Sequence, residues 1–246
     1  IGGAAAGASL FLLAPGTSSR RQREPFMGTN VAHRGLHSRD KSVPENSLEA
    51  FRLAAEAGYG IELDVQFSKD KQVVVFHDDT LDRVCGVHAR VDELTYDELK
   101  ELRLCGSDQT IPLFTEVLGV IRGRSPIICE LKNGRNNREL CEKTYEIISG
   151  YRGDICVESF NPMIVAWFRF HAKDLLRGQL AQPTRFYDAE TMSAPLAYAL
   201  GHTLFNCLAR PQFIAYRIGF RPLSVRMSEL LGAMRVGWTS HEPRNE

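Results

Sequence analysis

The chain has 246 residues, of which 43% are hydrophobic and 24% charged, which is ordinary for a soluble globular protein and ample for one large α/β domain. Lysine plus arginine and aspartate plus glutamate both number 30, so the formal net charge is zero. Because no global basic field would attract nucleic acid, we expect no nucleic-acid partner. The six cysteines lack CxxC spacing, which argues against a zinc knuckle or a redox site.

The beginning of the chain suggests a membrane segment. Residues 1–15 are apolar and uncharged, and a basic cluster lies within residues 20–23. The apolar run is shorter than the ~20 residues of a spanning helix, so it is predicted to be either the end of a transmembrane anchor or part of a signal peptide. The positive-inside rule favours an anchor with the domain facing the cytoplasm, and a secreted or periplasmic location is the alternative. Residues 16–28 are predicted to be a linker before a domain over 29–246.

Strand-like and helix-like segments alternate from residue 29 onward. Strands are expected at 29–33, 61–67, 72–77, 126–132, 155–160, 176–181, 212–218 and 234–240. A helix is expected after Asn46, with Asn46 as its N-cap and Glu49 completing a capping box. Further helices are expected at 93–104, 112–122, 138–149, 162–172, 188–205 and 222–233. Repeated βα units indicate a parallel sheet covered by helices.

The second and third strands need a separate interpretation. Only a short turn joins 61–67 to 72–77, whereas parallel neighbours need a crossover of about a dozen residues, so this pair is expected to form a hairpin. The other strands predict an α/β fold, a (β/α)₈ TIM barrel truncated before its last βα unit, with a β-hairpin and a short insertion after strand two. A doubly wound open sheet is the alternative, but no glycine-rich phosphate loop follows the first strand.

Chemically active side chains fall at the carboxyl ends of the predicted strands, where barrel enzymes place their catalytic groups. His33 can act as a general acid or base, and the guanidinium of Arg34 suits phosphate. Glu62 and Asp64 alternate with apolar neighbours, so both side chains should face the barrel interior. Two such carboxylates favour a divalent cation, Ca²⁺ or Mg²⁺, and salt bridges to basic residues are the alternative.

Two further segments extend this candidate site. The hairpin should return His77 to the level of Asp64, across the carboxylates from His33. Glu130 and Lys132 share one face of the next barrel strand, so Glu130 can be a third metal ligand and Lys132 can contact phosphate. The cation and the basic groups would neutralise a phosphodiester, and the histidines would transfer protons.

Seven motifs follow one another along the chain: AHRG (32–35), PENSLEAF (44–51), IELDVQFSKD (61–70), VVFHD (74–78), IPLFTEVL (111–118), CELK (129–132) and ESFNP (158–162). In order and spacing they resemble the glycerophosphodiester phosphodiesterase family, from about residue 30 to 240. The resemblance implies a TIM barrel that hydrolyses small glycerophosphodiesters to sn-glycerol 3-phosphate and an alcohol with Ca²⁺ or Mg²⁺. The nucleophile can be water or the glycerol hydroxyl of the substrate.

The resemblance also implies a role for each matching residue. By position these are the metal ligands Glu62, Asp64 and Glu130, the catalytic His33 and His77, the phosphate-binding Arg34 and Lys132, and the supporting acid Glu45. The chain departs from the family at Trp238-Thr239-Ser240-His241, where the family usually has Trp-Thr-Val-Asn, and it lacks the last strand with its Thr-Asp pair. The short insertion between 78 and 111 does not indicate the leaving alcohol.

Two other functions remain open. A lysophospholipase D or a phosphoinositide-cleaving phosphodiesterase would use the same site near a lipid surface. A non-catalytic, membrane-associated barrel would be expected to have lost some of these residues. The oligomeric state is not indicated by the sequence.

Overall fold

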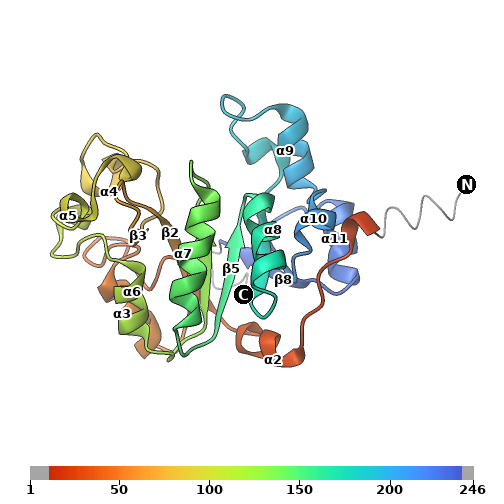
Figure 1. The fold of residues 1–246 in the computed structure, drawn as a ribbon, viewed down its shortest axis with the longest axis horizontal. Helices are drawn as coiled ribbons and strands as arrows, with labels where there is room; N and C mark the ends of the chain where they lie inside the picture. Colours follow the sequence, from red (N-terminus) through yellow and green to blue (C-terminus); the bar gives the residue numbers. More distant parts are fainter. Residues whose placement is uncertain (1–10, 240–246) are drawn as a thin grey trace, which may run out of the picture. The chain divides into compact units, whose positions relative to one another are not determined.

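The computed structural model describes residues 11–239, and these divide into two compact units (Figure 1). One unit is Glu24–Cys156. The other combines residues 11–23 with the described residues from Val157 onward. All eight candidate site residues belong to the first unit.

The unit Glu24–Cys156 is built around strand β2 (Gly60–Phe67), whose eight residues are all buried. Strands β1 (Val31–Ala32) and β4 (Ile127–Leu131) pair in parallel with β2 on its two sides. The third partner, β3 (Val73–Val75), pairs with β2 in antiparallel register, with Val75 opposite Val65. The predicted hairpin is therefore confirmed.

Helices α3 (Leu48–Glu56) and α6 (Phe114–Ile121) lie side by side in this unit (Figure 1), and α7 (Asn137–Ser149) follows β4. The predicted N-cap of α3 is wrong. Ser47 caps the helix, because its side chain accepts a hydrogen bond from the backbone N–H of Ala50 at 3.1 Å. Asn46 has a left-handed backbone with φ 54° instead, so its side chain is free to point toward the site.

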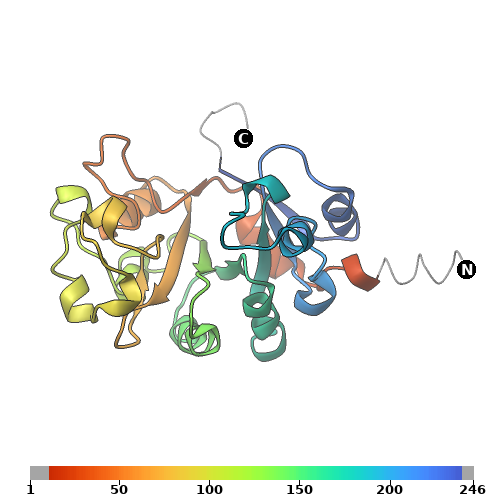
Figure 2. The same ribbon diagram turned by 90° about the horizontal axis from the view of Figure 1, so that it is seen from above.

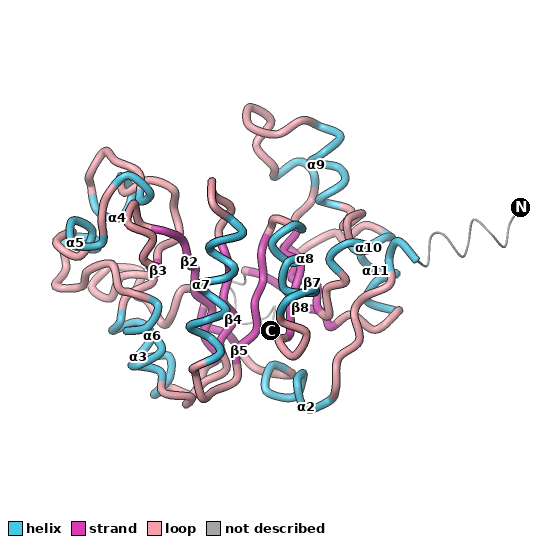
Figure 3. The backbone as a smooth tube through the Cα atoms, viewed as in Figure 1, coloured by secondary structure: helices cyan, strands magenta, loops and turns pink. Residues whose placement is uncertain are grey.

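The insertion between β3 and α6 is mostly loop (Figure 3), and it lies on one side of β2 as the yellow segment in Figure 2. The predicted helix over 93–104 is wrong, because only α5 (Tyr96–Leu99) is helical there, followed by the 3₁₀ turn η3 (Leu104–Gly106). The apolar residues that suggested a helix pack into a local cluster with the hairpin instead, with Leu99 and Leu104 almost fully buried. Tertiary packing here outweighs local helix propensity. The insertion also contains α4 (Asp82–Cys85) and η2 (Val91–Glu93).

The second unit continues the alternation of strands and helices. Its parallel strands are β5, which begins in the first unit, and then β6, β7 and β8 (Ile155–Ser159, Leu176–Ala181, Phe213–Arg217 and Met234–Trp238). The intervening helices are α8, α9, α10 and α11 (Pro162–His171, Ala194–Gly201, Asn206–Ala209 and Leu223–Leu230), with the turn η4 (Thr184–Phe186) before α9. Figure 1 shows α9 apart from α8.

The succession of parallel strands and helices confirms the predicted α/β class and TIM-barrel type of fold, with seven barrel strands and one hairpin strand within residues 11–239. The predicted linker contains α2 (Arg20–Arg23) and the turn η1 (Glu24–Phe26). Between residues 11 and 239 no helix has the length and apolar character to cross a bilayer. Most of the predicted membrane segment at 1–15 lies outside the described residues, as do Ser240 and His241.

Candidate active site

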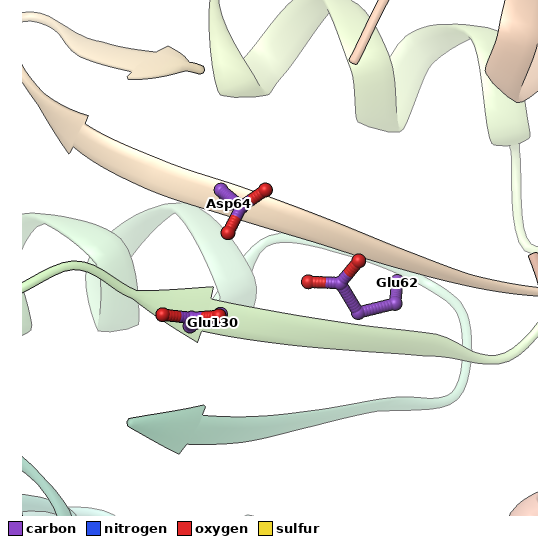
Figure 4. Close-up of side chains that lie close together, drawn as sticks. All are labelled: Glu62, Asp64 and Glu130. Atoms are coloured by element: carbon purple, nitrogen blue, oxygen red, sulfur yellow. The ribbon is translucent and has the colours of Figure 1, made fainter. Parts of the chain in front are cut away.

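Three buried carboxylates lie together on β2 and β4 (Figure 4). Glu62 and Asp64 project from the same face of β2 because alternate residues of a strand share a face. Glu130 lies directly beside Asp64 in the parallel register of β2 and β4. One oxygen from each of the three residues lies within 4.8 Å of the others. The alternation read from the sequence therefore places all three predicted ligands at one point.

The carboxylates repel one another in this buried position. Burial, with the negative charge of Asp64 as a further cause, raises the pKa of Glu130. Burial also opposes ionisation of Asp64, but the positive charges of Lys132 and Arg34 and the hydrogen bond from Asn46 outweigh it and lower the pKa of Asp64. The cluster thus favours protonation of one carboxyl group unless a cation neutralises it. Three hard oxygen donors are the ligands that Ca²⁺ and Mg²⁺ prefer, so the residues present fit a divalent cation.

Asn46 supplies a second indication that the site is built for a ligand. Its Nδ2 donates a hydrogen bond to Asp64 Oδ2 at 2.9 Å, and the residue is almost fully buried. Its Oδ1 has no hydrogen-bond partner among the described residues. A buried oxygen without a partner is rare in folded proteins, so this atom is suited to accept a hydrogen bond from a ligand or to approach a cation.

Lys132 lies against the carboxylates. Its Nζ is 2.8 Å from Glu130 Oε1 and 3.4 Å from Asp64 Oδ1. Burial opposes its charge, but the two carboxylates outweigh that effect and raise the pKa of Lys132, so the ammonium stays protonated. The side chain is therefore a fixed positive charge at the edge of the cluster.

Arg34 brings a second positive charge to the same carboxylates. Its Nε lies 3.6 Å from Asp64 Oδ2, and its NH1 donates to Glu45 Oε1 at 2.8 Å. The backbone of Arg34 is left-handed, with φ 58°, and its N–H donates to Glu62 Oε2 at 2.9 Å. This turn after β1 directs both the backbone amide and the guanidinium toward the carboxylate cluster.

The two histidines are both held in the neutral form. Burial and the neighbouring charge of Arg34 lower the pKa of His33 to about 4, and His33 Nε2 lies 3.9 Å from Glu62 Oε2. Burial also lowers the pKa of His77, whose Nδ1 is 2.6 Å from Asp78 Oδ1. A neutral imidazole that donates Nδ1–H to Asp78 leaves Nε2 free to accept a proton. Protonation of His77 would lower the pKa of His33 further, because the two imidazoles are close enough to repel each other as cations.

The hairpin positions His77 as the sequence predicts. The N–H of Phe76 donates to the carbonyl of Asp64 at 3.0 Å, so the next residue, His77, lies near the level of the carboxylates. Gln66 follows Asp64 on the same face of β2 and fixes this turn, because its Nε2 donates to the carbonyls of Phe76 at 2.8 Å and Asp78 at 2.9 Å.

Three contributors were not recognised as site residues from the sequence. The sequence predicts Asn46 to be a helix cap, and it shows Asp78 only as the neighbour of His77 in the VVFHD motif. No sequence motif indicates a role for Arg83 on α4. In the structure its Nε donates to Asp78 Oδ2 and its two terminal nitrogens donate to Glu45, at 2.6–2.9 Å. It therefore connects the acid beside His77 with the acid beside Arg34.

The fold and the site together define a class of protein. A barrel-type α/β fold with a carboxylate triad, two basic side chains and two neutral histidines at its strand ends is suited to metal-assisted chemistry on a phosphate ester. The model of the glycerophosphoryl diester phosphodiesterase family matches residues 33–243, and the chain belongs to this family. The predicted family resemblance is thus confirmed.

Several known proteins are similar to the chain. It is 32% identical over 164 residues to a human lysophospholipase D, GDPD1, covering 61% of this chain and 50% of that protein. It is 39% identical over 114 residues to a glycerophosphodiester phosphodiesterase of Caldanaerobacter subterraneus, covering 42% and 45%. The crystal structure of a glycerophosphodiester phosphodiesterase from Thermotoga maritima aligns with a TM-score of 0.65 and 27% identity, covering 88% of each chain. The chain spans about half the length of these two sequence relatives.

Proposed function

We propose that the chain hydrolyses glycerophosphodiesters to sn-glycerol 3-phosphate and an alcohol, in a reaction that requires Ca²⁺ or Mg²⁺. The observation that carries the proposal is the convergence of Glu62, Asp64 and Glu130 within 4.8 Å, beside two fixed positive charges. Membership of the family and the similarity to a named glycerophosphodiester phosphodiesterase support the same substrate class.

In this proposal the three carboxylates would hold the cation, and the basic groups would bind the phosphate. When bound, the cation would polarise the phosphoryl group and offset its negative charge. Arg34 is suited to the phosphate because a guanidinium can donate two parallel hydrogen bonds to its oxygens. Lys132 adds a positive charge that its carboxylate neighbours keep protonated.

The histidines would carry the protons. One of His33 and His77 takes the proton of the nucleophile, and the other gives a proton to the oxygen of the leaving alcohol. Asp78 orients the imidazole of His77 through Nδ1, so the exchanged proton resides on Nε2. If water is the nucleophile, it displaces the leaving alcohol and gives glycerol 3-phosphate in one step. If the glycerol hydroxyl of the substrate is the nucleophile, it displaces the alcohol to give a cyclic phosphodiester, which water then opens to glycerol 3-phosphate.

Replacing single members of the site tests the proposal. We expect His77→Ala to reduce the release of glycerol 3-phosphate at least a hundredfold, the lower end of the range for a lost general acid or base. Glu62→Ala should also abolish most of the release, because it removes a charged ligand of the proposed cation. Glu101→Gln changes an exposed carboxylate in the insertion and is the matched control. Near wild-type release by either site variant would contradict the roles assigned here.

The human relative favours a second candidate function, lysophospholipase D activity. A lysolipid has the same phosphodiester but adds an acyl chain to the glycerol. Comparing glycerophosphocholine with lysophosphatidylcholine under identical conditions separates the two activities. Preferential cleavage of the lysolipid would replace the first proposal with the second.

We also propose that the apolar residues 1–15 associate with a membrane and leave the following domain on its cytoplasmic side. The support is the basic cluster that follows the apolar run. Fractionation of cells that express the chain tests this, with protease protection to determine the side. Recovery in the unbound fraction would contradict it.

A further inference from the structure

A cavity of about 160 Å³ lined by charged residues opens beside the carboxylate cluster, and the mechanism above does not use it. Gln66 lines the cavity and lies on the same face of β2 as Glu62 and Asp64. Lys132 lines it as well, and its ammonium contacts Glu130. The cavity therefore begins where the proposed phosphate site ends, and an occupant of one can extend into the other.

Basic side chains outnumber acidic side chains around this cavity. Its lining includes five basic residues and two acids, which are Lys69, Lys71, Arg90, Lys132 and Arg135, and Asp79 and Asp92. Both acids already face a guanidinium. Arg90 Nε is 2.9 Å from Asp92 Oδ1, and its NH1 is 3.9 Å from Asp79 Oδ2. Lys71 and Lys132 pair with acids outside the lining, at 3.3 Å from Glu139 Oε2 and 2.8 Å from Glu130 Oε1. The positive charge available to an occupant therefore comes chiefly from Lys69 and from Arg135, whose nearest acid is 3.9 Å away.

The cavity is also unsuited to a quaternary ammonium group. Phe67 is the one aromatic side chain among the described residues that line it. Two ammonium groups already lie over its ring, with Lys71 Nζ at 5.0 Å and Lys143 Nζ at 5.5 Å from the centroid. A cationic ligand is bound by a free aromatic face or by an acid without a partner. In this cavity the ammonium groups over Phe67 would repel such a ligand.

We infer that this cavity binds the leaving alcohol and selects alcohols that carry an anionic group over cationic alcohols such as choline. The inference rests on the function proposed above. The glycerol half of the substrate is neutral, so the positive charge of the lining would add nothing to its recognition. The volume equals that of about five water molecules at ~30 Å³ each, which suits a small polar alcohol.

Three substrates of similar size test this selectivity, because all release glycerol 3-phosphate but differ in the charge of the alcohol. These are glycerophosphoglycerate with a carboxylate, the neutral glycerophosphoglycerol, and glycerophosphocholine with its cation. We expect kcat/KM to fall in that order, by about tenfold from first to last. For each of two exposed lining charges about 6 Å from the occupant, the preference for an anion over a cation is about threefold in a water-like dielectric screened by physiological salt.

The double variant Lys69→Gln with Arg135→Gln should reduce the ratio of the anionic to the cationic substrate about tenfold. Arg138→Gln is the matched control, since Arg138 is an exposed arginine of α7 that pairs with Glu142 and does not line the cavity. The control should keep the wild-type ratio. Equal or faster cleavage of glycerophosphocholine by the wild type, or an unchanged ratio in the double variant, would overturn the inference alone. Failure to cleave any of the three substrates would overturn the proposed function and this inference with it.

Discussion

Arg83 clamps Glu45 with two hydrogen bonds, from NH1 to Oε2 at 2.9 Å and from NH2 to Oε1 at 2.6 Å. Its Nε donates to Asp78 Oδ2 at 2.6 Å. Glu45 also accepts from Arg34, and Asp78 holds Nδ1 of His77. One guanidinium therefore links the partners of a proposed phosphate-binding residue and a proposed proton carrier, although it contacts neither directly.

Arg83 is accordingly expected to act as a positioning residue. Replacing it with Gln should lower kcat about tenfold or more and raise KM, because a displacement of ~1 Å in a catalytic geometry costs up to ~100-fold in rate. Arg83→Lys should recover little, since an ammonium cannot donate to both acids with the geometry of a guanidinium. Steady-state kinetics for both variants measure the effect.

Arg52→Gln is the control for that experiment, because Arg52 bridges Glu49 and Glu56 on the surface of α3, away from this network. It should leave kcat and KM unchanged. A purely structural role for Arg83 predicts a lower melting temperature with unchanged kinetic constants, and that result would contradict the positioning role.

The ion pairs of Glu45 predict a pH dependence of stability. Burial opposes ionisation of Glu45, but Arg83 and Arg34 outweigh it and lower its pKa from 4.5 to about 2. Since the folded state lowers the pKa, this stabilisation is complete above about pH 4.5 and is lost as the pH falls toward about 2. The stability advantage of the wild type over Glu45→Gln should therefore narrow across that window.

Denaturant unfolding at pH 7, 4.5 and 3 measures this difference. Glu101→Gln again serves as the control, because Glu101 is an exposed residue of the insertion. A difference between wild type and Glu45→Gln that stays constant over the window would show that the ion pairs do not stabilise the folded state.

The carboxylate cluster predicts stabilisation by a divalent cation. A ligand that binds only the folded state at a hundred times its Kd adds about 2.7 kcal/mol, which raises the melting temperature of a chain of this size by several degrees. Thermal unfolding with Ca²⁺, with Mg²⁺ and with a chelator should show this shift and identify the preferred ion.

Glu130→Gln should abolish most of the cation-dependent shift, because it removes one of three charged ligands. It should also raise the melting temperature of the cation-free protein, since a neutral amide avoids the cost of a buried charge and the repulsion by Asp64, which together raise the pKa of Glu130. An identical cation-dependent shift in wild type and variant would place the binding site elsewhere.

Two adjacent residues have different roles: Ser47 caps α3, and Asn46 contacts the carboxylate cluster. Ser47→Ala should destabilise the protein by about 1 kcal/mol, because the Ala50 N–H loses its capping oxygen. Asn46→Asp should chiefly impair activity, since it replaces a donor to Asp64 with a carboxylate. Chemical unfolding measures the loss of stability, and glycerol 3-phosphate release measures the loss of activity. If Asn46→Asp changed the stability and left the activity intact, the role of Asn46 in the site would be contradicted.

Local periodicity explains why the core of the site was predictable from the sequence. The alternation in β2 fixes the face that carries Glu62 and Asp64, and parallel pairing then brings Glu130 beside them. The turn between β2 and β3 is too short for a parallel crossover, so the two strands must form a hairpin. The hairpin brings His77 back beside the carboxylates. These placements follow from backbone geometry within a few residues.

The surrounding residues were not predictable because tertiary packing determines their positions. Arg83 reaches Glu45 and Asp78 only after the insertion has folded onto its own apolar cluster, which also disrupts the helix expected over 93–104. Asn46 does not cap α3 as expected, because its backbone is left-handed and the helix begins one residue later, with Ser47 as the N-cap. No pattern in the sequence indicates either arrangement.

Release of glycerol 3-phosphate from glycerophosphoglycerol, with and without chelator, tests the central claim most directly. The account predicts release in the presence of Ca²⁺ or Mg²⁺, its loss on chelation and its recovery when the cation is restored. Glu62→Gln should lose this activity while Glu101→Gln retains it. Release that persists in excess chelator, or that is equal in wild type and Glu62→Gln, would contradict a cation-dependent reaction at the Glu62, Asp64 and Glu130 cluster.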